Sequence, residues 1–61
     1  MPTVTIKARA IPLEKKRELV EKVTALVVET CSVPASAVTV FLEEYPSENI
    51  GVGGCLICDR K

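Results

Sequence analysis

Histidine and tryptophan are absent from this chain of 61 residues, which has one tyrosine and one phenylalanine. Without histidine, a common nitrogen ligand for zinc is missing, and so few aromatic rings leave little for nucleobases to stack on. Eight basic and eight acidic residues give a formal net charge of zero, which argues against an electrostatic footprint for nucleic acid. We therefore expect neither a metal site nor a nucleic-acid partner.

The three cysteines are an odd number, so they cannot form a complete disulfide framework. Cys55 and Cys58 form a Cys-x-x-Cys motif. A redox pair of this kind normally opens a helix, whereas this one falls in a predicted strand. One pair also half-fills a tetrahedral zinc site, although symmetric copies could complete it. We favour structural cysteines without stoichiometric metal, with redox or metal chemistry as the alternative.

Long apolar runs are also missing. No segment approaches the roughly 20 apolar residues of a membrane span, and the N-terminus lacks the layout of a secretion signal. We expect a soluble cytoplasmic protein with no membrane partner and a single domain over residues 1–61. Because 48% of the residues are apolar and so short a chain buries little surface alone, we expect copies of the chain to associate.

Changes of hydrophobic period divide the chain into elements. Apolar and polar residues alternate over residues 3–10, which predicts a strand. A second strand is predicted over residues 38–45, where Val38, Val40 and Leu42 face one way and Thr39, Phe41 and Glu43 face the other. Between them, a stripe at about 100° per residue predicts a helix from Leu13 to about Cys31. The stripe consists of Leu19, Val20, Val23, Leu26, Val27 and Cys31. Because Cys31 belongs to it, we expect a buried thiol that reacts slowly.

Glycines mark the last element. Gly51-Val52-Gly53-Gly54 predicts the turn of a hairpin that closes with a strand over residues 55–58. The fold class is therefore α+β: a βαβ unit with parallel strands, followed by a C-terminal β-hairpin. A two-stranded sheet with one helix is not stable alone, so we expect a dimer with a four-stranded sheet and two helices. Glu43 and Glu44 are expected on a solvated face or paired with Lys7 or Arg9.

Pro2 lies directly behind the initiator methionine and directly before the first strand. Methionine is usually removed before a small residue, and its removal would leave Pro2 with a free secondary amine. An α-amino group has a pKa of about 8. Burial disfavours its charged form and lowers that pKa, which makes the amine a base at neutral pH. Pro2 is our candidate catalytic base, with Arg9, Thr39 and Ile50 as the residues that bind substrate. The alternative is that proline is merely common at this position.

The chain resembles the 4-oxalocrotonate tautomerase family, the small-subunit branch of the tautomerase superfamily, over essentially all 61 residues. The resemblance rests on four segments in this order: Met1-Pro2 before a strand, Glu14-Lys15-Lys16 opening a helix, Val33-Pro34 before Val38-x-Val40, and Gly51-Val52-Gly53-Gly54. It implies a hexamer of three dimers and no cofactor. It also implies an N-terminal proline that acts as general base in keto–enol or 1,3-allylic isomerisation.

Three positions depart from the family pattern, which places one arginine before the helix, another on the second strand and an aromatic ring before the glycine turn. This chain has Ile11, Thr39 and Ile50 there. We expect Arg9 to supply the guanidinium from a shifted position and meet the developing oxyanion. The sequence predicts a cofactor-independent tautomerase of a small, anionic 2-oxo acid or enol. The missing arginines favour the alternative, an oligomeric scaffold or binding protein with weak or no catalysis.

Overall fold

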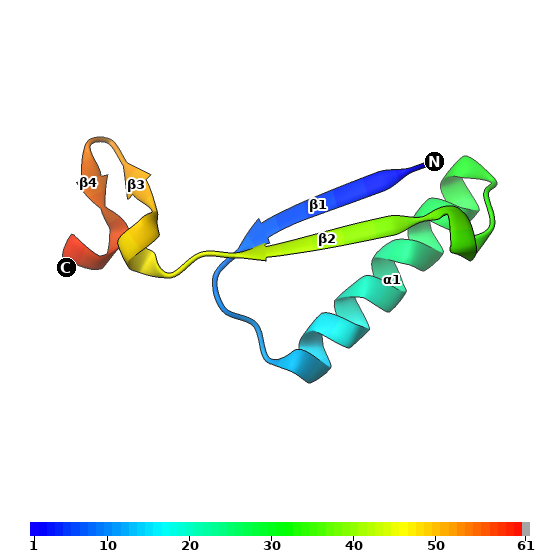
Figure 1. The fold of residues 1–61 in the computed structure, drawn as a ribbon, viewed down its shortest axis with the longest axis horizontal. Coiled ribbons are helices and arrows are strands. Elements are labelled where there is room, and N and C mark those ends of the chain that lie inside the picture. The colour runs from blue at the N-terminus through cyan, green and yellow to red at the C-terminus, as the bar shows by residue number, and fades with distance from the viewer. Residues whose placement is uncertain (61) are drawn as a thin grey trace.

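A strand, a helix and a second strand form the main body of the molecule. The computed structural model describes residues 1–60, with β1 (Thr3–Ala8), α1 (Leu13–Cys31) and β2 (Thr39–Glu44) in that order. β1 and β2 lie side by side and pair in parallel (Figure 1). The predicted βαβ unit is therefore confirmed.

Burial alternates along β1, as the sequence predicts. Val4, Ile6 and Ala8 are half-buried and the residues between them are exposed. The register places them opposite Val40, Leu42 and Glu44 of β2. These residues form the face of the sheet that α1 covers. The other face is uncovered in the single chain and leaves Phe41 51% exposed.

Both strands are shorter than predicted. The pairing of β1 with β2 ends where the Tyr45 N–H donates to the Ala8 carbonyl at 3.0 Å. Arg9 and Ala10 therefore belong to the loop that leads to Pro12, rather than to β1. β2 begins and ends one residue inside the predicted range.

The helix α1 has the predicted bounds because it is delimited at both ends. The Pro12 carbonyl accepts hydrogen bonds from the N–H groups of Lys15 and Lys16, both at 3.0 Å. Glu14 lies in the first turn, where a negative charge is favourable to the helix dipole. After Cys31 the chain turns at Ser32, which has a left-handed φ of 56°, a conformation that ends many helices.

The stripe predicted for α1 is wrong at two residues. Leu26 is 63% exposed, and the Cys31 thiol is exposed in the single chain. Val27 faces the sheet, and because neighbouring helical residues point about 100° apart, Leu26 points to the side. Cys31 lies in the last turn, where the chain leaves the helix at Ser32. The inner face is instead half-buried at Lys16, Leu19, Val20, Val23, Thr24, Val27 and Val28.

The C-terminal hairpin is confirmed, although its second strand is shorter than predicted. β3 (Gly51–Val52) and β4 (Cys55–Leu56) pair antiparallel. Gly53 and Gly54 form the turn with φ values of 62° and 86°, which favour glycine. Residues Ile57–Asp59 form a 3₁₀ turn instead of continuing the strand. Figure 1 shows the hairpin extending from the end of β2, away from the sheet and α1.

The single chain has no buried core within residues 1–60. Its radius of gyration is 14.9 Å, whereas a compact chain of this length has about 10.5 Å. Its accessible surface is 4764 Å², against about 3,900 Å² for a folded monomer of this mass. No helix in residues 1–60 is long and apolar enough to cross a membrane. The elements are well formed, but they need further surface to pack against.

Candidate active site

The four candidate residues fall into two pairs at opposite ends of the sheet. Pro2 and Thr39 lie where β1 and β2 begin, and the Thr39 N–H donates to the Pro2 carbonyl at 3.1 Å. Both residues are half-buried. Met1 is 96% exposed, so the Pro2 nitrogen lies at an accessible end of the sheet and would become an amine on removal of Met1.

Arg9 and Ile50 form the second pair, at the carboxyl ends of the strands. Together with Lys7, Ala8 and Tyr45 they line an open cavity of about 380 Å³. The cavity lies where the chain leaves β1 for the loop before α1 and leaves β2 for the hairpin. Its accessible lining is almost wholly apolar, so the apolar parts of these side chains form its walls.

The length of β1 separates the candidate base from the candidate cation. Six residues, all of them in β1, lie between Pro2 and Arg9, and at about 3.3 Å per residue they span roughly 20 Å. One chain thus places Pro2 beside Thr39 and not beside Arg9 or Ile50.

Two cationic side chains border the cavity, although its accessible lining is almost entirely apolar. Lys7 and Arg9 lie two residues apart, and neither has an ion-pair partner among the residues that the structure describes. Glu43 is opposite Lys7 in the register, but its carboxylate accepts a hydrogen bond from the Tyr45 hydroxyl at 2.7 Å. That bond raises the pKa of Tyr45, so the phenol stays protonated. The two free cations suit the cavity to an anionic ligand.

Sequence reasoning missed Lys7 and Tyr45 as members of this cavity. The position of Lys7 was visible, because alternation places it on the same strand face as Arg9. Tyr45 gave no such signal, because its place depends on the parallel register of β1 and β2. Its side chain reaches the cavity only once Ala8 and Glu44 are paired.

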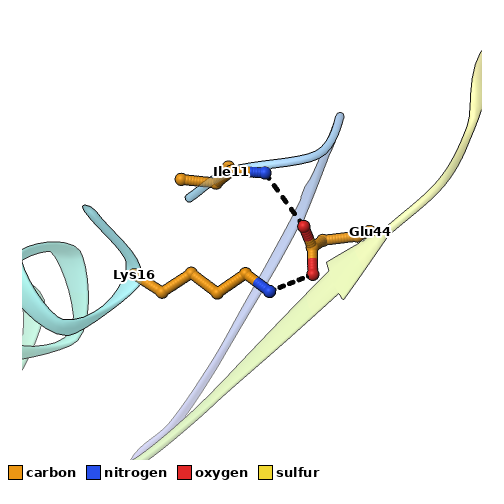
Figure 2. A network of polar contacts seen from close by, with 3 residues as sticks. All are labelled: Ile11, Lys16 and Glu44. Carbon is orange, nitrogen blue, oxygen red and sulfur yellow. Dashed lines mark hydrogen bonds and ion pairs between the residues drawn. The ribbon is translucent and has the colours of Figure 1, made fainter. Parts of the chain in front are cut away.

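Glu44 joins three segments of the chain at the edge of this cavity. One carboxylate oxygen accepts the Ile11 N–H at 2.9 Å, and the other pairs with the Lys16 ammonium (Figure 2). The predicted pairing of Glu44 with Lys7 or Arg9 is therefore wrong. Glu44 is in register with Ala8, which puts it on the helix face. The hydrogen bond from Lys16, followed by that from Ile11, lowers the pKa of Glu44.

Acidification is expected to remove the stabilising contribution of Glu44. The pKa of its carboxyl lies below the ordinary value of 4.5, so the contribution is fully present above that pH and is lost as the pH falls through the lowered pKa. Thermal unfolding at fixed protein concentration should show a wild-type advantage over Glu44→Gln at about pH 7 that shrinks toward about pH 3. Glu48→Gln, at an exposed carboxylate, is the control. An advantage that does not change with pH would contradict the expectation.

Cys55 and Cys58 are both exposed on the hairpin. The Cys58 sulfur lies 3.8 Å from the Asp59 carboxylate. Within residues 1–60, no three or more His, Cys, Asp or Glu side chains form a group that could hold a metal ion. That the cysteines carry no stoichiometric metal stays a prediction for elemental analysis.

Comparison with known proteins gives one consistent result. Residues 2–60 match a family described as "Tautomerase enzyme". The chain is 40% identical over 62 residues to the 2-hydroxymuconate tautomerase of Bacillus subtilis, with all of both chains covered. A solved homologue of 4-oxalocrotonate tautomerase is 38% identical at a TM-score of 0.90, covering 98% of this chain and 100% of the other. A heterohexameric 4-oxalocrotonate tautomerase from Chloroflexus aurantiacus, 24% identical and covered fully in both chains, has the same fold at a TM-score of 0.87.

Proposed function

This chain belongs to the tautomerase family of isomerases, and from that premise we propose that Pro2, freed by removal of Met1, is its general base. The substrate is a small, anionic 2-oxo acid or its enol. Pro2 takes a proton from carbon next to the carbonyl and returns it at another atom, which gives keto–enol or 1,3-allylic isomerisation. No cofactor is required for this proton transfer.

The observation that carries the proposal is an apolar cavity bordered by two cations, Lys7 and Arg9, that lack ion-pair partners within residues 1–60. Proton removal next to a carbonyl develops negative charge on oxygen, and a positioned cation lowers the energy of that charge. We assign this role to Arg9, with Lys7 as a second positive charge beside it. Ile50 contributes an apolar wall, which in contact with an amine would favour its neutral, basic form.

A second copy of the chain completes the site. In the structure β1 pairs with β2 along one edge only, so its other edge is available for pairing. A two-fold axis perpendicular to the sheet would pair β1 with β1 of the partner in antiparallel fashion, with both helices on the same face. That arrangement brings Pro2 of one chain to the end of the sheet where the partner subunit's Arg9 and the partner's Ile50 lie. Thr39, next to Pro2, would then orient the substrate from the first chain.

The experiment that tests this function is ketonisation of phenylenolpyruvate, a simple enol, by the mature protein beside its Pro2→Ala variant. The second candidate function is an oligomeric scaffold or binding protein that retains the fold. The threonine at position 39, in place of the family's arginine, favours that candidate. Intact mass measurement separates the two, because retention of Met1 would leave an amide nitrogen at Pro2 that cannot act as a base.

The protein is expected to assemble as a hexamer of three dimers. Phe41, on the uncovered face of the sheet, is 51% exposed in a single chain, and pairing along β1 alone would leave that face open. The heterohexamer from Chloroflexus aurantiacus supports the view that this fold can associate in sixes. Native mass spectrometry should detect six chains of 6.6 kDa each. A monomer at micromolar concentration would contradict both the assembly and the shared site. The cytoplasmic location stays a prediction.

A further inference from the structure

The loop that carries Arg9 is attached to β2 on both sides. Before Arg9, the Ala8 carbonyl accepts the Tyr45 N–H at 3.0 Å. After Ala10, the Ile11 N–H donates to the Glu44 carboxylate at 2.9 Å. Only Arg9 and Ala10 lie between these two attachments, so the backbone that directs the Arg9 side chain has little freedom.

The second attachment depends on a side chain that is itself held in place. Lys16, on the inner face of α1, pairs with the other carboxylate oxygen of Glu44 (Figure 2). The side chains of Lys16 and Glu44 are 28% and 33% exposed, so each is partly shielded from water. The two oxygens of one carboxylate thereby join the end of β2, the loop and the first turns of α1. This arrangement fixes the direction in which Glu44 presents its oxygen to Ile11.

We propose that Glu44 is a positioning residue that holds Arg9 at the cavity, with Lys16 as its support. The inference rests on the proposed function, in which Arg9 meets the negative charge of the substrate. Glu44 itself does not line the cavity, whereas its neighbour Tyr45 does. Without the Ile11 attachment, the segment around Arg9 must be ordered when substrate binds, and that ordering opposes binding.

The test compares single and double variants in steady-state kinetics with an anionic enol. Glu44→Ala should raise KM about tenfold or more, because small displacements of a binding group are costly, while kcat changes less. Glu44→Gln keeps an oxygen for the Ile11 N–H and should recover part of the loss. In Arg9→Ala, the further change Glu44→Ala should add little, because the residue being positioned is gone. Glu18→Ala removes an exposed helix carboxylate that pairs with Lys15 and Lys22 and serves as the control.

Hydrogen exchange supplies a readout that does not depend on turnover. The Ile11 amide should exchange faster in Glu44→Ala than in the wild type, and Glu18→Ala should leave it unchanged. Unchanged exchange in Glu44→Ala would overturn the proposal whatever the activity is. Additive effects of Arg9→Ala and Glu44→Ala would also overturn it, because Glu44 would then act independently of Arg9. Equal activity of the wild type and Pro2→Ala would contradict the proposed function. The exchange rate of the Ile11 amide would still decide whether Glu44 holds the loop.

Discussion

The Pro2→Ala variant is expected to lose at least about 10²-fold in the rate of phenylenolpyruvate ketonisation, the scale at which a positioned general base contributes. The variant still has an N-terminal amine after removal of Met1, but that amine is primary and lacks the ring that fixes its direction. The loss should appear mainly in kcat, because the proton is transferred in the chemical step.

Thr3→Ala is the matched control for Pro2→Ala. Thr3 is the next residue and is exposed at the start of β1, so its change alters the same end of the strand without touching the amine. Intact masses must establish that both variants and the wild type lack Met1. Full activity in a correctly processed Pro2→Ala protein would exclude Pro2 as the base.

Mixing two inactive variants is expected to restore activity. Arg9→Ala should lower the rate for an anionic substrate by 10²-fold or more, about the loss of one charge-stabilising donor. In a dimer of one Pro2→Ala chain and one Arg9→Ala chain, one of the two sites carries both changes and the other carries neither. Random pairing makes half of the dimers mixed, so about a quarter of all sites should be intact.

The complementation experiment uses coexpression of the two variants with different purification tags. Native mass spectrometry establishes that mixed assemblies have formed. Recovery near a quarter of wild-type activity supports a site built from the amino end of β1 in one chain and the carboxyl end of β1 in its partner. Mixed assemblies with no more activity than their parents would exclude that division of the site, even if Pro2 remains essential.

Local patterns in the sequence were sufficient to predict the main elements. The helix bounds at Leu13 and Cys31 were confirmed because proline precedes the helix and a left-handed residue follows it. The alternation of Val4 and Ile6 with polar neighbours identified the face that α1 covers. These features depend on residues close together in the chain, which is why one sequence sufficed.

Features that depend on how the elements pack were predicted less well. The partner of Glu44 was wrong because, although alternation places Glu44 on the face of Val40 and Leu42, the approach of Lys16 to that face depends on how α1 packs on the sheet. Leu26 was assigned to the inner face because hydrophobicity alone does not locate the centre of the contact with the sheet. The cavity containing Lys7 and Tyr45 was missed for the same reason. The separation of Pro2 from Arg9 follows from the length of β1. The four candidate site residues were grouped by their residue types, without regard to that length.

The six residues of β1 (Thr3–Ala8) have a consequence for substrate length. If β1 pairs antiparallel with its partner copy, the span from base to cation is set by where the two strands align. A shift of two residues would preserve which side chains face the helix, yet it would move the amine by about 7 Å relative to the cations. Selectivity for short or long substrates in this architecture would then change through strand alignment, without replacement of any residue that lines the cavity.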